Sequence, residues 1–269
     1  RMIVSDFAVL TSVYSRYSLK YTLRSLRSLG FRKIELWCGV SHFYPDYIDE
    51  PEAKALIKTL RRYDIEIISL MPDKGGSHFN LASDNRDVRQ STVSYYKHCA
   101  DLCGVMGIDH MTIHPGQGFL NKPMKNAFDC AVEAMQQVAE HALSRGVVPA
   151  VLHGGANFAP SFKRTLELLN AINLTGVKIV LDANRAWCDG EDLEGLLSSH
   201  GEISLIQLSD GPEGPLALGD GRIPVKTLCS VINDAGYAGR VVLNLDNRRY
   251  VMDPGAAVAK TAETINSWT

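Results

Sequence analysis

Polar side chains capable of acid-base or metal chemistry stand at the ends of several short apolar runs. His114 and His153 each close such a run, and Asp182 closes another. Histidine has an ordinary pKa near neutrality, so it can accept and return a proton at physiological pH. A carboxylate can orient a histidine, share its acid-base work or bind a cation. The pattern therefore indicates a site that moves protons, with or without a metal ion.

Further polar residues recur at the same kind of position. Residues two apart on a strand share a face, so Asn244 and Asp246 should point the same way. One such residue alone is commonly a loop anchor or a helix cap, but their recurrence favours a shared polar pocket. The candidates for substrate binding are Glu35, His42, His114, Arg185, Gln207, Asp210, Asn244 and Arg248.

The elements that would position these residues alternate along the whole chain. Apolar runs predict strands at 7–12, 34–37, 65–71, 110–114, 148–153, 177–182, 203–209 and 240–246. Amphipathic stretches predict helices at 18–29, 51–63, 84–103, 123–145, 161–170, 192–199, 225–235 and 254–268. Strands that alternate with helices pair in parallel through right-handed crossovers. Eight such units predict an α/β fold, a single (β/α)8 TIM-barrel domain over residues 1–269, with its site at the carboxyl ends of the strands.

Composition and charge exclude several classes of protein. The net charge is -2, from 28 basic and 30 acidic residues, so we expect no nucleic-acid partner. The longest purely apolar stretch, 147–152, is far shorter than the roughly 18 residues of a membrane span. The first residues lack the charged and apolar segments of a signal peptide. We therefore expect a cytoplasmic protein whose six cysteines are reduced thiols.

Motifs for nucleotide cofactors are weak. Gly116-Gln117-Gly118 follows a predicted strand, but no third glycine or immediate helix completes a dinucleotide fingerprint. We therefore expect no nucleotide cofactor.

His42, His78 and Lys74 fall in loops on the pocket side, where a solvated position is the simpler interpretation of each.

The order of several short motifs resembles the xylose-isomerase-like barrels, which include sugar isomerases and sugar 3-epimerases. These motifs are Gly30-Phe31-x-x-Ile34-Glu35-Leu36-Trp37, Ile113-His114-Pro115-Gly116, Val180-Leu181-Asp182, Leu208-Ser209-Asp210 and Leu218-Gly219-Asp220-Gly221. The resemblance covers nearly the whole chain. The stretch Trp37-Cys38-Gly39-x-x-His42 looks most similar to fructoselysine 3-epimerases, with tagatose and psicose 3-epimerases close by. The resemblance implies a barrel that takes a sugar or sugar phosphate and assembles as a homo-oligomer.

The resemblance also implies a metal site, which this sequence alters. Epimerases of the family hold one divalent cation, usually manganese or cobalt, with Glu, Asp, His and Glu from strands five to eight. The two glutamates are also their acid-base pair. The matching positions here are His153, Asp182, Gln207 and Asn244, so ligand charge falls from -3 (one Asp, two Glu) to -1 (Asp182 alone). Hard cations prefer carboxylates, whereas histidine suits softer metals. We therefore expect at most a weakened or rebuilt site for Mn, Co or Zn.

Three functions remain open. The one we favour is a sugar isomerase or epimerase that abstracts a proton next to a carbonyl. Its base would be His153, with Asp182 orienting it or holding a metal. Asp246 would be the second acid-base group, and Arg185 or a metal would act as the electrophile. The second function is a barrel without catalysis that binds a sugar or a protein partner. The third is a metal-free lyase or isomerase on an anionic substrate, bound by arginines such as Arg185 and Arg248.

Overall fold

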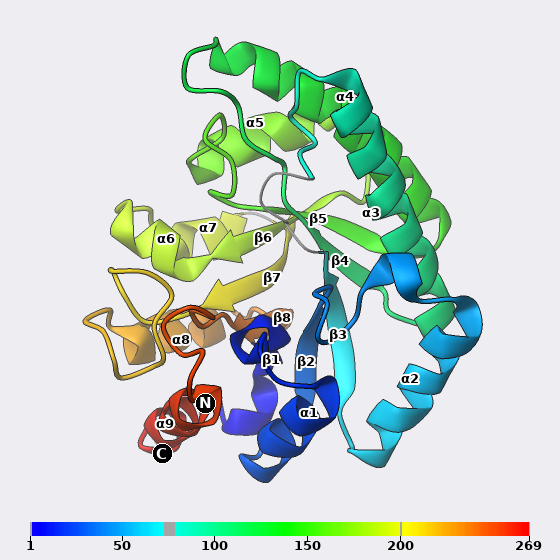
Figure 1. Ribbon diagram of the computed structural model, residues 1–269. Coiled ribbons are helices and arrows are strands. Elements are labelled where there is room, and N and C mark those ends of the chain that lie inside the picture. The colour runs from blue at the N-terminus through cyan, green and yellow to red at the C-terminus, as the bar shows by residue number, and fades with distance from the viewer. Residues whose placement is uncertain (1, 73–78, 200, 269) are drawn as a thin grey trace.

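Eight parallel strands form a closed barrel in chain order, and β8 pairs with β1 to complete the ring (Figure 1). The computed structural model describes residues 2–72, 79–199 and 201–268. The strands are β1 (Ala8–Leu10), β2 (Lys33–Trp37), β3 (Glu66–Met71), β4 (His110–Ile113), β5 (Val148–Leu152), β6 (Lys178–Asp182), β7 (Ile203–Leu208) and β8 (Arg240–Leu243). The predicted (β/α)8 barrel is confirmed.

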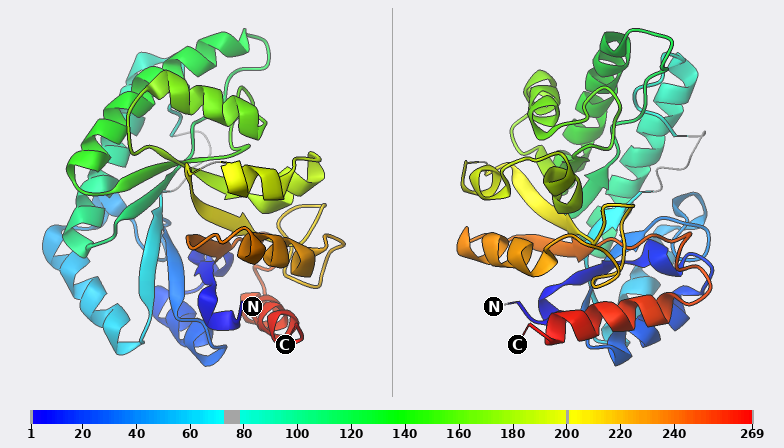
Figure 2. Two further views of the ribbon diagram at one scale, coloured as in Figure 1. Left: turned by 180° about the vertical axis from the view of Figure 1, so that it is seen from behind. Right: turned by 90° about the vertical axis from the view of Figure 1, so that its left-hand side faces the viewer.

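Helices surround the barrel on its outside (Figures 1 and 2). They are α1 (Leu19–Ser28), α2 (Glu50–Arg62), α3 (Arg86–Met106), α4 (Met124–Ser144), α5 (Phe162–Ile172), α6 (Ala183–Cys188), α7 (Leu193–Ser199), α8 (Val225–Asp234) and α9 (Pro254–Asn266). Short 3₁₀ helices lie at η1 (Val4–Asp6), η2 (Thr11–Tyr14) and η3 (Pro45–Tyr47). The last helix, α9, packs beside α1 and η1, so elements from the two ends of the chain are neighbours.

The helix α6 is absent from the sequence-based prediction. It follows β6 directly, because the Asp182 carboxylate accepts a hydrogen bond from the Arg185 backbone N–H and caps its first turn. A helix of 6 residues is too short to show a helical period in the sequence. The other predicted helices are present with small changes at their ends.

Several strands end earlier than predicted. β1 stops at Leu10, and the following residues turn into η2. β8 stops at Leu243, so Asn244 and Asp246 lie in the segment beyond it rather than on the strand. The backbone there is still anchored, because the N–H of Asn244 donates to the carbonyl of Leu208 in β7. Asn244 and Asp246 therefore belong to the loop at the barrel mouth, whereas Asp182 is the last residue of β6.

The core has two layers. Apolar residues such as Ile34 and Leu36 pack outward against the helices in one large cluster. A smaller cluster fills the barrel interior, and its members are Ala8, Leu10, Met71, Ala150, Leu152, Val180, Leu205 and Val242. The interior also holds polar side chains. Glu35 lies between Ile34 and Leu36, which face outward, so its side chain faces the inside of the barrel, where it is fully buried.

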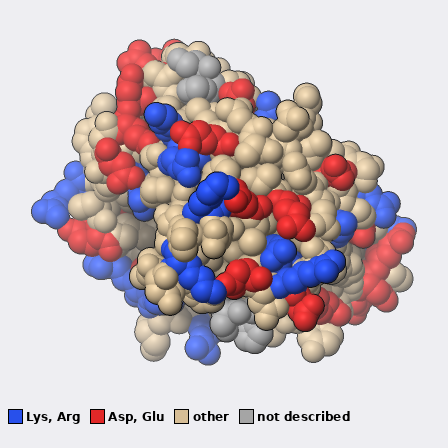
Figure 3. Space-filling model, turned by 90° about the horizontal axis from the view of Figure 1, so that it is seen from above, with Lys and Arg blue, Asp and Glu red and all other residues tan. Residues whose placement is uncertain are grey.

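Charged side chains of both signs lie on the surface of the barrel (Figure 3). On the face shown in Figure 3, acidic and basic side chains are interspersed rather than gathered by sign. Among the described helices, none combines the length and the apolar composition needed to cross a membrane.

Candidate functional site

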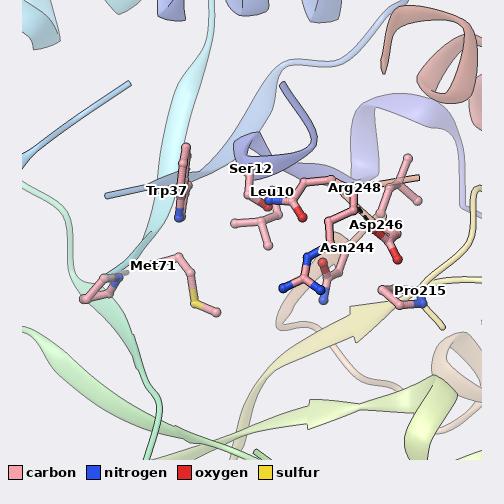
Figure 4. Close-up of a pocket in the computed structure, with 11 residues that line it drawn as sticks. Leu10, Ser12, Trp37, Met71, Pro215, Asn244, Asp246 and Arg248 are labelled. Carbon is pink, nitrogen blue, oxygen red and sulfur yellow. Dashed lines mark hydrogen bonds between the residues drawn. The ribbon is translucent and has the colours of Figure 1, made fainter. Parts of the chain in front are cut away.

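A polar pocket of about 320 Å³ opens at the carboxyl ends of β1, β2, β3 and β8 (Figure 4). Its lining residues are Leu10, Ser12, Trp37, Met71, Pro72, Pro215, Asn244, Leu245, Asp246, Asn247 and Arg248. Active sites of (β/α)8 enzymes lie at this end of the barrel. One wall is apolar and aromatic, while the segment after β8 supplies an amide, a carboxylate and a guanidinium. We name this hollow the mouth pocket.

Trp37 forms the aromatic wall of the mouth pocket. Its backbone N–H donates to the Thr11 hydroxyl oxygen, 3.0 Å away, and its ring meets the His42 ring edge-on at 5.7 Å. The indole also covers Gly39, where a Cβ atom would come within 1.9 Å of the ring. The absence of a side chain at Gly39 therefore lets the indole lie flat against the backbone.

His42 supports this wall instead of lining the pocket. Its Nε2 lies 3.1 Å from the Tyr17 carbonyl oxygen, which can only accept, so Nε2 carries the proton. Its Nδ1 then accepts from the Thr11 hydroxyl at 3.1 Å. Burial lowers the pKa of His42 to about 4, so the ring is neutral at neutral pH. The expected solvated position is wrong for His42, while Lys74 and His78 lie outside the described residues.

Asp246 and Arg248 form a turn at the edge of the pocket. The Asp246 Oδ1 accepts hydrogen bonds from the backbone N–H groups of Arg248, at 2.7 Å, and Arg249, at 3.0 Å. The turn fixes the carboxylate beside the pocket and lets the Arg248 side chain extend into it (Figure 4). The expectation that Asn244 and Asp246 serve one pocket agrees with this lining, although both lie beyond the strand.

The side-chain amides of Asn244 and Gln207 and the buried carboxyl group of Glu35 lie next to one another in space below the mouth pocket. The Asn244 side-chain N–H donates to the Gln207 carbonyl oxygen, 3.1 Å away, and Gln207 is buried. Glu35 Oε1 accepts from the hydroxyls of Thr112, at 2.6 Å, and Ser69, at 3.0 Å. Burial raises the pKa of Glu35, and these hydroxyls oppose the rise. Glu35 and Gln207 were both expected to bind substrate, but the structure places them among buried residues that do not line the mouth pocket.

The buried polar network continues through the barrel to His110, which sequence reasoning missed. The Ser69 hydroxyl donates to Glu35, so it accepts from the N–H at His110 Nδ1, 2.8 Å away. His110 Nε2 then accepts from the Ser204 hydroxyl at 2.9 Å. Burial, with a smaller contribution from the charge of Arg240, lowers the pKa of His110 to about 3. His110 begins β4 instead of ending it, so the pattern of polar residues at strand ends does not include it.

His153 belongs to a second group, apart from the mouth pocket. Its side chain has no exposed surface, and its Nε2 lies 3.2 Å from Glu191 Oε2. Neither ring nitrogen makes a hydrogen bond to another described residue. Burial lowers the pKa of His153, while the charges of Glu191 and then Asp182 raise it. Glu191 was not predicted, since it lies in the loop after α6 and only folding brings it to His153.

Asp182 and Arg185 complete this second group. Asp182 is occupied as the cap of α6, where its Oδ1 lies 3.0 Å from the Arg185 backbone nitrogen. Burial raises the pKa of Asp182, whereas the nearby backbone N–H of Arg185 and the charge of His153 lower it. The Arg185 side chain donates to Asp189 at 2.5 Å. Arg185 is thus paired with a carboxylate of its own helix end and does not line the mouth pocket.

Asp210 organises the loop after β7. Its Oδ1 accepts from the N–H groups of Gly211, at 2.8 Å, and Ile223, at 3.0 Å, and its Oδ2 accepts from Gly219 at 3.0 Å. A Cβ atom at Gly221 would come within 2.3 Å of Asp210 Oδ1. The Gly219-Asp220-Gly221 motif is therefore the loop that wraps this carboxylate. Asp210, expected to bind substrate, is buried in that role.

His114 also serves its own loop. Its backbone N–H donates to the Tyr96 hydroxyl at 3.1 Å, and its Nδ1 accepts from the Gly116 N–H at 3.2 Å. Of the predicted site residues, the mouth pocket therefore brings together Asn244, Asp246 and Arg248. Trp37 and Ser12 join them without having been predicted, because apolar and hydroxyl residues at strand ends carry no distinctive sequence pattern.

The four positions that match the family's metal ligands do not fit a divalent cation. No group of three or more His, Cys, Asp or Glu side chains able to hold a metal is present among the described residues. The Gln207 carbonyl oxygen already accepts from Asn244, and Asp182 caps α6. The positive charge of Arg185 also acts on both Asp182 and His153. A cation is held best by several convergent carboxylates, and this set offers one.

The family match covers residues 23–268, under the description "Xylose isomerase-like TIM barrel". The chain belongs to this family. Among solved structures, D-allulose 3-epimerase from Methylomonas sp. is similar at 15% identity and a TM-score of 0.79, over 100% of this chain and 99% of that one. D-psicose 3-epimerase from Clostridium cellulolyticum H10, solved with D-tagatose, has 15% identity and a TM-score of 0.75, with 97% and 99% covered.

The IolI protein, solved with a bound zinc atom, is also similar, at 16% identity and a TM-score of 0.75 over 98% and 97% of the two chains. At these identities the structural likeness establishes the shared barrel fold. The zinc atom in IolI shows that a barrel of this fold can hold a metal ion. It does not show that the present chain has residues able to bind one.

Proposed function

We propose that this chain is a sugar isomerase or epimerase that abstracts a proton next to a carbonyl without the family's two-glutamate metal centre. The observation that carries the proposal is the mouth pocket, where Asp246 and Arg248 lie across from Trp37. Family membership and the names of the similar structures, which include ketose 3-epimerases, support a sugar as substrate.

In this proposal the pocket residues divide the work of binding. The Trp37 ring packs against the apolar C–H face of the sugar, as aromatic walls do in small-molecule sites. The Asn244 side-chain amide hydrogen-bonds a hydroxyl group of the sugar. The hydrogen bond from Asn244 to Gln207 holds that amide in place. The Arg248 guanidinium binds the carbonyl oxygen and stabilises the negative charge that develops there.

Asp246 is the proposed acid-base group. Its Oδ1 is held by two backbone N–H groups, and Oδ2 accepts no hydrogen bond from the described residues. Oδ2 takes the proton from the carbon next to the carbonyl, which leaves an enediolate and a neutral carboxylic acid. Return of this proton to the neighbouring carbon on the same face, with the hydroxyl proton passing to the former carbonyl oxygen, gives the isomer. The epimer forms when a water molecule protonates the original carbon from the opposite face and Asp246 returns its proton to solvent. We assign His153 to support of the α5 and α6 loops, because its side chain is fully buried outside the pocket.

The test of this proposal is the exchange of substrate C–H for deuterium in D₂O, followed by proton NMR with D-fructose, D-psicose, D-tagatose and L-ribulose. We expect exchange with at least one ketose and a loss of about 100-fold or more in Asp246→Asn. The asparagine oxygen can still accept from Arg248 and Arg249, so the turn is kept. Asp234→Asn is the matched control, because Asp234 is exposed at the end of α8. Full exchange in Asp246→Asn would show that another residue is the base.

A second function, sugar binding without catalysis, is favoured by one observation. Among the described residues that line the mouth pocket, Asp246 is the one carboxylate, whereas the family uses two. A barrel of this kind would gain thermal stability from a ketose, since a ligand that binds the folded state stabilises it. Stabilisation without deuterium exchange for any ketose of the panel would establish this function in place of catalysis.

A further inference from the structure

A second hollow of about 720 Å³ adjoins the mouth pocket. The two hollows share Trp37, Asn247 and Arg248. We name the second one the outer hollow. A ligand whose reacting carbons lie beside Asp246 can therefore extend past Trp37 into the outer hollow without leaving the protein surface.

The two hollows differ in charge. Asp246 and Arg248 together make the lining of the mouth pocket neutral. The outer hollow is lined by Arg16 and Arg248, and its described lining contains no Asp or Glu, so it carries two positive charges. Within the described part of the chain, neither arginine forms an ion pair. Asp246 offsets the charge of Arg248 from the side of the mouth pocket, so the two linings together keep one positive charge, that of Arg16. A net positive charge on a concave surface attracts an anion.

The backbone that carries Arg16 is held from both sides. The Ser41 hydroxyl donates to the carbonyl of Ser15 at 2.7 Å, and His42 Nε2 donates to the carbonyl of Tyr17 at 3.1 Å. The backbone N–H of Arg248 is likewise fixed by Asp246. Both guanidinium groups therefore extend from anchored turns. A fixed starting point reduces the conformational entropy that each side chain loses when it binds an anion.

We propose that the outer hollow is an anion subsite and that the substrate is a ketose with a phosphate or carboxylate on the end away from its carbonyl. The sugar part of this inference rests on the function proposed above. Guanidinium groups bind phosphate and carboxylate oxygens with two parallel N–H donors, which point charges such as lysine cannot do. Arg248 reaches both hollows and so links recognition of the anion to the carbonyl end of the substrate.

Calorimetric titration at low ionic strength tests the proposal with four compounds, which are D-fructose, D-fructose 6-phosphate, D-fructuronate and inorganic phosphate. We expect one of the two charged ketoses to bind at least about tenfold more tightly than D-fructose. Arg16→Gln should remove this preference and leave the affinity for D-fructose unchanged. Lys20→Gln is the matched control, because Lys20 is an exposed cation in α1 outside both hollows. The charged ketose that binds more tightly shows whether the subsite prefers a phosphate or a carboxylate.

In the same titration, Arg248→Gln should lower the affinity for the charged ketose. The neighbouring Arg249→Gln should leave that affinity unchanged, since Arg249 lines neither hollow. Arg16 and Arg248 are both exposed, so unchanged melting temperatures should show that the variants are folded. Equal affinities for D-fructose and both charged ketoses, or a preference that survives in Arg16→Gln, would overturn the anion subsite while the proposed ketose function stands. Binding of inorganic phosphate that depends on Arg16, with no ketose bound, would overturn the proposed function and keep the subsite.

Discussion

Gly39 leaves room for the indole of Trp37, and this single position sets the shape of the aromatic wall. An alanine Cβ would lie within 1.9 Å of the ring, so the ring must swing away from the backbone. An indole ring displaced in this way changes the width of the mouth pocket and loses its edge-on contact with the His42 ring. In the proposed function, ligand binding at this wall therefore depends on Gly39, which lines neither hollow.

Gly39→Ala should lower the affinity for the best ketose by about tenfold, because the wall is displaced. The free energy of unfolding should fall by only about 1 to 2 kcal/mol, since a side chain can move more easily than backbone. Calorimetric titration and urea unfolding measure the two effects separately. Gly201→Ala is the control, because a Cβ at Gly201 meets open space. Ketose affinity unchanged in Gly39→Ala would mean that Trp37 is not part of the binding site.

At the scale of elements, His42 ties the loop after β2 to η2 and α1. Its neutral ring accepts from Thr11 in η2 and donates to the carbonyl of Tyr17, just before α1. Burial holds its pKa at about 4, below the ordinary 6.5. A histidine with a lowered folded pKa contributes stability that is complete above its unfolded pKa. That contribution is lost as the pH falls from 6.5 toward 4.

The stability difference between the wild type and His42→Gln should therefore shrink as the medium is acidified. Between pH 6.5 and pH 5 the wild type should lose about 1.6 kcal/mol relative to the variant, because the slope rises to about 1.4 kcal/mol per pH unit only below the unfolded pKa. Urea unfolding of both proteins at several fixed pH values gives this difference directly. A difference that stays constant over this range would show that the ring is not held neutral by the fold.

The elements were the most predictable level of the structure. Strand and helix periods are local properties of the sequence, so their eight alternations predicted the barrel. The predicted ends of the strands were less accurate, because a residue such as Asn244 can keep one hydrogen bond to the neighbouring strand and still lie beyond the end of its own strand. The helix α6 escaped prediction because a cap by Asp182, and not a period, begins it.

At the scale of the whole molecule, the site was only partly predictable. The polar residues at strand ends all lie near the barrel mouth, but loop contacts decide which of them face the pocket. Asp210 is taken up by three backbone N–H groups, and His153 is covered beside Glu191, a partner that the sequence could not place. Trp37 belongs to a recognisable sequence motif, yet its role as a wall follows from its packing over Gly39.

The whole molecule also explains why the altered metal positions matter. The barrel keeps the family's framework, while the residues from β5 to β8 are engaged with each other or with loops. The mouth pocket lies on the other side, between β8 and β3, and supplies a carboxylate and a guanidinium. We therefore propose that proton abstraction in this chain depends on Asp246 and Arg248 and not on a bound divalent cation.

The most direct test is the rate of solvent deuterium exchange into the best ketose before and after removal of metal. Protein dialysed against a strong chelator, with its metal content checked by elemental analysis, should exchange at the rate of the untreated protein. Addition of Mn²⁺, Co²⁺ or Zn²⁺ should leave that rate unchanged, because the described residues offer no cluster to hold them. Loss of exchange on chelation, with recovery on addition of one of these ions, would contradict the account.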